Sequence, residues 1–168
     1  ESAKRAGLTP KNCIVWDKGG GGLGAMYANT HEFVGFWAKT PPKSSMAGKD
    51  QQRTGERTVP RPNIFRASRP SGDERQHNAA KPVALFEELI NNSTDPGQIV
   101  VDMFLGSGPI FIAAEQSGRL ACGVDMEPKW CDVAIKRWEA FTGQSATLEG
   151  DGRTFSEITE ERVIPVDK

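Results

Sequence analysis

Residues 98–125 constrain the fold more than any other part of the chain, because they predict a strand, a glycine loop, a helix and a second strand in direct succession. Residues 98–102 form an apolar run that ends in an acid, and residues 110–117 have helical character. Residues 120–125 form a second apolar run, which also ends in an acid. Two short strands joined by a helix pair in parallel, so this part of the chain predicts an α/β fold with a parallel sheet.

A loop with two glycines follows the first of these strands. Gly106 and Gly108 allow the chain to turn sharply and let a ligand lie close to the backbone at the carboxyl edge of the sheet. Asp125 stands 23 positions after Asp102, at the end of the next strand, where a carboxylate can accept both hydroxyls of a ribose. The pattern predicts a site for a nucleotide-type cofactor.

Charge favours S-adenosylmethionine among such cofactors. Asp102 would repel the pyrophosphate of a dinucleotide, and Phe111 stands where dinucleotide sites have a third glycine. No Gly-Lys-Ser/Thr follows the loop, which excludes a phosphate-binding P-loop. An acid at this place suits a positive sulfonium and ammonium. A dinucleotide site and a purely structural glycine turn stay open as alternatives.

The chain divides into three parts by composition. Residues 1–38 predict a short helix, a strand over 12–16, a glycine loop and a strand over 32–39. Residues 77–168 hold the α/β unit, preceded by an amphipathic helix after Pro82 and followed by a helix from Pro128. On this last helix Trp130 and Trp138 are expected to share a face and pack against the sheet.

The part between them, residues 39–76, is rich in proline and basic residues. From position 39 to 75 it has nine Lys and Arg against four Asp and Glu, a local charge of 9 − 4 = +5 in a chain of net charge −1. A solvated loop and a segment that contacts phosphates are the two interpretations.

Three stretches, taken together, resemble the permuted (beta-class) DNA amino-methyltransferases, which modify the exocyclic amino group of adenine or cytosine. The first is Ile14-Val15-Trp16-Asp17-Lys18 with its glycine loop, Tyr27 and His31-Glu32-Phe33. The second is His77-Asn78-Ala79-Ala80-Lys81-Pro82. The third is Asp102-Met103-Phe104-Leu105-Gly106-Ser107-Gly108, followed by Gly123-Val124-Asp125 and Arg137. The order of these motifs covers nearly all of the chain up to about Gly143.

The resemblance implies a Rossmann-like α/β methyltransferase fold with S-adenosylmethionine as cofactor and DNA as partner. The cofactor-binding residues that it implies are His77, Lys81, Pro82, Asp102, Phe104, Gly106, Ser107, Gly108 and Asp125. Taken alone, Lys81 and His77 could also be ordinary residues at a helix start. The basic part falls where such enzymes often carry target recognition, so the expected DNA contacts are Arg53, Arg57, Arg61, Arg66 and Arg69.

One family motif is absent from the 168 residues, the catalytic tetrapeptide Asp/Asn/Ser-Pro-Pro-Tyr/Phe/Trp. Thr40-Pro41-Pro42-Lys43 lacks both the polar group and the aromatic ring that hold the target base. No catalytic residue is therefore assigned, and the sheet is expected to have a gap between the strands of Val101 and Val15. The chain is interpreted as the C-terminal part of a longer methyltransferase, or as a degenerate copy. A methyltransferase with a non-DNA substrate and a non-catalytic DNA-binding relic are the alternatives.

Composition excludes several other classes. No stretch approaches the roughly 20 apolar residues of a membrane span, so no membrane partner is expected. Three scattered cysteines suit free thiols in a reducing compartment, and a cytoplasmic protein, encoded by a bacterium or phage, is expected. The spacing of the histidines and cysteines fits no zinc pattern, so no metal is expected.

Overall fold

A computed structural model describes residues 2–20, 26–39, 62–69 and 81–162, and its N-terminal part is a small sheet with the order β2-β1-β3. The elements are α1 (Ser2–Arg5), β1 (Thr9–Asp17), β2 (His31–Ala38) and β3 (Ile64–Arg66). β1 and β2 pair antiparallel, with Trp16 opposite Glu32. Residues on β2 alternate between exposed and half-buried, as expected for a strand with one covered face.

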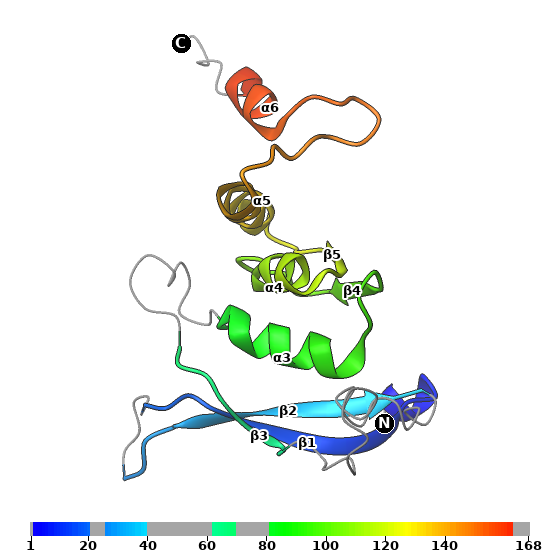
Figure 1. The fold of residues 1–168 in the computed structure, drawn as a ribbon, viewed down its shortest axis with the longest axis vertical. Helices are drawn as coiled ribbons and strands as arrows, with labels where there is room; N and C mark the ends of the chain where they lie inside the picture. Colours follow the sequence, from blue (N-terminus) through cyan, green and yellow to red (C-terminus); the bar gives the residue numbers. More distant parts are fainter. Residues whose placement is uncertain (1, 21–25, 40–61, 70–80, 163–168) are drawn as a thin grey trace, which may run out of the picture.

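The C-terminal part alternates helices and strands. Its elements are α3 (Val83–Ser93), β4 (Ile99–Asp102), α4 (Pro109–Ser117), β5 (Leu120–Gly123), α5 (Pro128–Thr142) and α6 (Phe155–Arg162). β4 and β5 pair in parallel, with Asp102 opposite Gly123. Along the long axis of the molecule, α3 lies between the three-stranded sheet and the layer of α4, β4 and β5 (Figure 1). The predicted α/β unit is confirmed.

The core of this part forms where α3, α4 and α5 meet the glycine loop. Its buried members are Ile90, Leu105, Ile110, Ala113 and Ala134. Ile110 and Ala113 are three residues apart on one face of α4, and burial of this face together with Ile90 of α3 stabilises the packing of the two helices. Leu105 comes from the loop itself, so the loop is anchored in the core and its backbone is held at the edge of the sheet.

β4 and β5 form a sheet of their own, and neither pairs with β1, β2 or β3 in the described part of the chain. The strands of Val101 and Val15 thus belong to two separate sheets, and the expected gap between them stays a prediction. One face of the β4–β5 pair is open: Ile99, Val101 and Leu120 are 60–62% exposed, and Cys122 beside Val101 is also exposed. Parallel sheets are normally covered on both faces, so this face has the character of an interior surface.

Three helices end at glycines where the sequence predicts a helix end, and each of these glycines has a positive φ. Gly7 follows α1, Gly118 ends α4 and Gly143 ends α5, with φ values of +71°, +67° and +70°.

Two elements were not predicted from the sequence: β3, a strand inside the basic part, and α6. No helix within the described ranges has the length and apolar character to cross a membrane.

Candidate cofactor site

A cavity of about 230 Å³ lies at the carboxyl ends of β4 and β5, where the sequence placed the cofactor. It is lined by residues from α3 and the segment before it, from the glycine loop between β4 and α4, and from the start of α5. The lining residues are Lys81, Phe86, Asp102, Phe104, Leu105, Gly106, Ser107, Pro109, Asp125, Glu127 and Trp130.

Backbone hydrogen bonds fix the glycine loop against the end of β5. Val124 N–H donates to the Asp102 carbonyl, and Leu105 N–H donates to the Val124 carbonyl, each at 3.0 Å. Gly106 and Gly108 have φ values of +52° and +68°, a left-handed conformation that glycine adopts without strain. The loop can therefore turn back directly after β4 and lead into α4.

Asp125 links the glycine loop to the start of α5. Its Oδ1 accepts the N–H of Glu127 at 3.0 Å, and its Oδ2 accepts the N–H of Gly106 at 2.8 Å. These backbone donors, that of Glu127 first, hold the pKa of Asp125 below its usual range, because they stabilise the charged form. A carboxylate with a lowered pKa stays ionised at neutral pH and keeps lone pairs for a ligand.

Asp102 and Ser107 occupy the two ends of the same loop. Asp102 Oδ1 accepts the N–H of Phe104 at 2.9 Å, a local turn that aims the carboxylate along the loop. Ser107 is 4% exposed, and Arg137 on α5 approaches its hydroxyl at 3.4 Å. Phe104, in contrast, is 87% exposed at the rim of the cavity.

Lys81 places a positive charge at the cavity and also contacts the three-stranded sheet β2-β1-β3, called the first sheet below. Its Nζ lies 2.9 Å from Glu32 Oε2 on β2 and 5.4 Å from the centroid of Trp16 on β1. Lys18 Nζ lies 3.5 Å from the other oxygen of Glu32. Burial raises the pKa of Glu32, but the hydrogen bond and charge of Lys81, with Lys18, outweigh it, and the pKa is lowered.

Six of the nine predicted cofactor residues line this cavity: Lys81, Asp102, Phe104, Gly106, Ser107 and Asp125. Pro82 and Gly108 lie outside the lining. Pro82 is the extended residue before α3, and Gly108 packs against α5, where a Cβ on it would lie 2.6 Å from that of Ala134. His77 is outside the described residues.

The sequence did not point to Phe86, Glu127 or Trp130 as lining residues. Glu127 and Trp130 could have been found, because Pro128 starts a helix shortly after the predicted strand that ends at Asp125. A helix start at that place lies at the same edge of the sheet as the glycine loop. Phe86 belongs to an amphipathic helix, and no local signal separates its inner face from a cavity wall.

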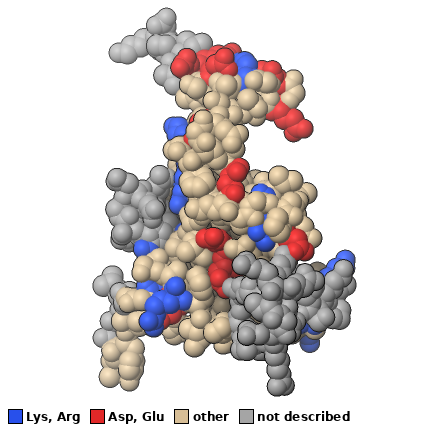
Figure 2. Space-filling view, viewed as in Figure 1, with Lys and Arg blue, Asp and Glu red and all other residues tan. Residues whose placement is uncertain are grey.

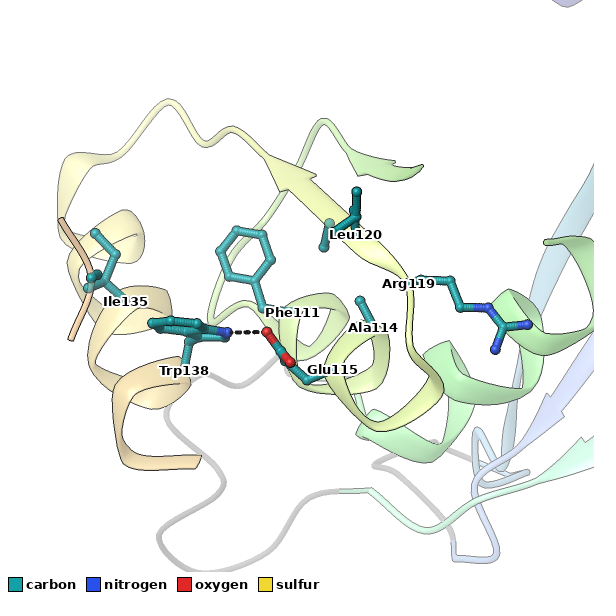
Figure 3. Close-up of a pocket in the computed structure, with 9 residues that line it drawn as sticks. Phe111, Ala114, Glu115, Arg119, Leu120, Ile135 and Trp138 are labelled. Carbon is teal, nitrogen blue, oxygen red and sulfur yellow. Dashed lines mark hydrogen bonds between the residues drawn. The ribbon is translucent and has the colours of Figure 1, made fainter. Parts of the chain in front are cut away.

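Trp130 and Trp138, which were expected to share a face of α5 and to pack against the sheet, line two different cavities. Trp130 lines the candidate site, whereas Trp138 lines a second cavity of about 340 Å³ between α4, β5 and α5. Figure 3 shows this second cavity, with Trp138 Nε1 donating to Glu115 Oε1 at 2.9 Å beside Phe111. Eight residues on a helix amount to about 80° of rotation beyond two full turns, which is enough to direct the two rings to different sites.

The predicted DNA contacts are only partly within the described chain. Arg53, Arg57 and Arg61 lie outside it. Arg66 on β3 pairs with Asp17 at 2.8 Å while 78% of its side chain stays exposed, and Arg69 is exposed. At the opposite end of the molecule, Asp and Glu side chains gather over α6 (Figure 2).

In the described part of the chain no three His, Cys, Asp or Glu side chains form a group that could hold a metal ion.

Comparison with known proteins identifies the family. The sequence profile of the N6/N4 methylases, described as "DNA methylase", matches residues 2–136. The Type II methyltransferase M.HpaI of Haemophilus parainfluenzae is 25% identical over 147 residues, which are 80% of this chain and 46% of that protein. The chain thus spans less than half the length of this relative.

Solved structures agree with this match. The M1.HpyAVI–SAM complex aligns with a TM-score of 0.62 at 27% identity, over 80% of this chain and 65% of that chain. The cytosine-N4-specific PvuII DNA methyltransferase aligns with a TM-score of 0.65 over 94% of this chain and 57% of that one. At 19% identity the latter supports the fold alone. The predicted Rossmann-like methyltransferase fold is confirmed.

Proposed function

Since the chain belongs to the N6/N4 DNA methylase family, we propose that it is the cofactor-binding part of a site-specific DNA methyltransferase. The enzyme would transfer a methyl group from S-adenosylmethionine to the exocyclic amino group of adenine or cytosine. One observation carries this proposal: two carboxylates, Asp102 and Asp125, flank a glycine loop at a cavity on the carboxyl edge of a parallel sheet. We further propose that the protein is bacterial and cytoplasmic, because the proposed substrate is DNA and the relative M.HpaI comes from a bacterium.

The residues at the cavity fit S-adenosylmethionine. Asp125 suits the ribose hydroxyls, Asp102 suits the ammonium group, and Phe104 and Trp130 offer apolar surface for the adenine ring. When bound there, the cofactor supplies an electrophilic methyl group on a sulfonium. The chain's own part is to hold the amino-acid and ribose groups and so to fix where the methyl group points.

Transfer to a base requires groups that this chain does not supply. The amino nitrogen of a base inside a duplex is out of reach, so such enzymes rotate the base into a pocket beside the methyl group. The catalytic tetrapeptide that would hold that base is absent from the sequence. We propose that a further polypeptide segment, preceding this part in the permuted order, provides it.

The open sheet face supports a missing segment. Ile99, Val101, Leu120 and Cys122 form an apolar face on β4 and β5, and β4 has no second partner in the described chain. The cavity, at about 230 Å³, is below the roughly 300–1,000 Å³ of most ligand clefts. A strand added beside β4, with a helix over this face, would cover the apolar surface and extend the wall of the cavity next to Phe104.

Calorimetric titration with S-adenosylmethionine tests the first part of the proposal. The wild-type chain should bind with micromolar affinity, and Asp125→Ala should weaken binding at least tenfold, about 1.4 kcal/mol. Asp132→Ala is the matched control, because Asp132 is exposed on α5 and does not line the cavity. A folded wild-type chain that binds no cofactor, alone or joined to the unmatched segment of a relative, would refute the proposal.

Thiol labelling tests the docking of the missing segment. A variant with Cys13→Ser and Cys131→Ser leaves Cys122, on the open face, as its only thiol. Addition of the catalytic segment of a relative should slow labelling of Cys122 and restore transfer of labelled methyl groups to DNA. Unchanged labelling would refute docking at this face. Slowed labelling and bound cofactor without methylation of DNA would instead support a relic or a non-DNA substrate.

A further inference from the structure

Glu32 of β2 holds two lysines at once. Its carboxylate lies 2.9 Å from Lys81 Nζ and 3.5 Å from Lys18 Nζ. The side chain of Lys18 is 3% exposed and that of Lys81 38% exposed, so Lys18 is enclosed and Lys81 faces an accessible space. The ring of Trp16, which is 1% exposed, lies under the ammonium of Lys81 at 5.4 Å. One carboxylate facing two ammonium groups leaves this cluster with a net charge of +1.

This cluster reaches the candidate cofactor site through Lys81. Lys81 is the only Lys or Arg that lines the described cavity, whose other charged lining residues are Asp102, Asp125 and Glu127. The cavity therefore has carboxylates on the glycine-loop side and a single ammonium on the side of the first sheet. A ligand that fits both must carry a positive and a negative group.

The amino-acid end of S-adenosylmethionine has this pair of charges. Its ammonium and sulfonium match the carboxylates, and its own carboxylate requires a cation. Resting on the function proposed above, we infer that Lys81 binds the cofactor's carboxylate and that Glu32 is the positioning residue that holds Lys81 in place for it. The lysine side chain is long and flexible, so contacts with Glu32 and Trp16 restrict it before the ligand arrives.

Glu32 would then do more than stabilise the sheet. Lys18 and Lys81 share the single negative charge of Glu32. The positive charge of Lys81 is therefore only partly compensated, and Lys81 can still bind an anionic group of a ligand. Removal of the Glu32 charge frees the Lys81 side chain, which then samples positions outside the cavity. The loss should be confined to ligands with a carboxylate, because the adenosine end is held elsewhere, by Asp125 and the glycine loop.

Two ligands separate positioning from general stability. S-adenosylhomocysteine carries the amino-acid end, and 5′-methylthioadenosine has the same adenosine and thioether without it. Calorimetric affinities are measured for the wild type, Glu32→Gln, Glu32→Asp, Lys81→Met and Glu149→Gln. Glu149 is exposed in the loop after α5 and does not line the cavity, so its variant is the matched control for the loss of one carboxylate.

Glu32→Gln and Lys81→Met should each weaken S-adenosylhomocysteine about tenfold and leave 5′-methylthioadenosine within about twofold of the wild type. A double variant that carries both Glu32→Gln and Lys81→Met should bind S-adenosylhomocysteine no more weakly than Lys81→Met alone, because the two changes remove the same interaction. Glu32→Asp should recover part of the loss. Lys81→Met leaves the Glu32–Lys18 pair in place and tests the contact if Glu32→Gln does not fold.

Unchanged S-adenosylhomocysteine affinity in folded Glu32→Gln and Lys81→Met would overturn the inference. Equal weakening of both ligands would also overturn it, because a structural role alone gives that result. A wild-type chain that binds neither ligand would instead overturn the proposed function, so the two failures are distinguishable.

Discussion

Asp125 and Gly106 are joined by a hydrogen bond of 2.8 Å, in which the carboxylate two residues after β5 accepts the backbone N–H of the loop that follows β4. The carboxylate that is placed to bind a ribose therefore also sets the shape of the loop that the cofactor must approach. Since a second oxygen accepts the N–H of Glu127, three segments of the cavity wall meet at this one side chain. Loss of its charge should affect the loop and the ligand together.

Asp125→Asn should make the folded chain less stable at neutral pH and change how its stability depends on pH. The folded pKa of Asp125 lies below the usual carboxyl value of 3.8, because the N–H groups of Glu127 and Gly106 favour the ionised form. A lowered folded pKa gives stability that is present above the unfolded pKa and is lost as pH falls through the folded value. Urea unfolding at several pH values between 7 and 3 measures this.

The stability difference between the wild type and Asp125→Asn should be constant at neutral pH and shrink below about pH 4. Asp132→Asn is the control, since Asp132 is exposed on α5 and its variant removes one carboxylate outside the cavity. A stability difference that persists unchanged down to pH 3 would show that the side-chain amide introduced by Asp125→Asn, and not the loss of the Asp125 charge, destabilises the variant.

Gly108→Ala should destabilise the chain by about 2–5 kcal/mol. An alanine at a φ of +68° costs about 1–2 kcal/mol, and its Cβ would lie 2.6 Å from that of Ala134, an overlap that costs about 1–3 kcal/mol more. Gly150→Ala is the matched control, because Gly150 has a φ of +80° and no neighbouring atom within 4 Å of the place that a Cβ would take, so only the conformational cost applies. Equal losses in chemical unfolding would refute the packing argument.

Trp16→Phe should cost more than Trp37→Phe on the neighbouring strand. Trp16 is 1% exposed, and its Nε1 donates to the Ala67 carbonyl at 2.8 Å, which ties β1 to the residue after β3. Removal of that donor costs about 1–3 kcal/mol, and the smaller ring adds a packing defect. Trp37 is 43% exposed, so its variant should stay within about 0.5 kcal/mol of the wild type in urea unfolding. Similar losses for both would contradict the anchoring role of Trp16.

The fold of residues 81–143 was predictable because local signals agree there. Pro128 starts a helix, Gly118 and Gly143 end helices, and short apolar runs between them form the strands. β3 had no such signal, since it has three residues within a proline- and arginine-rich segment and forms only by pairing with β1, about 50 residues away. Long-range pairing of this kind does not appear in local patterns.

α6 could have been found from its first residues. Thr154 and Glu157 form a reciprocal capping box, in which Thr154 N–H donates to Glu157 Oε2 at 2.7 Å and Glu157 N–H lies 3.3 Å from the Thr154 hydroxyl.

The candidate site was predictable where a motif lies on one loop, as for Asp102 to Ser107. The interaction of Glu32 with Lys81 was not, because 49 residues separate them and their contact depends on how the first sheet meets the segment before α3.

DNA affinity should depend differently on Arg66 and Arg69, if the basic part contacts phosphates. Arg69→Gln should lower the slope of log affinity against log salt concentration by about 0.9, the value for one phosphate contact. Arg66→Gln should change it less, because Asp17 at 2.8 Å already compensates the guanidinium charge. Asp17→Asn should strengthen DNA binding, since it leaves the exposed Arg66 charge uncompensated. Fluorescence anisotropy with a labelled duplex at several salt concentrations measures all three. Equal effects of Arg66→Gln and Arg69→Gln would show that the ion pair with Asp17 opens when DNA binds.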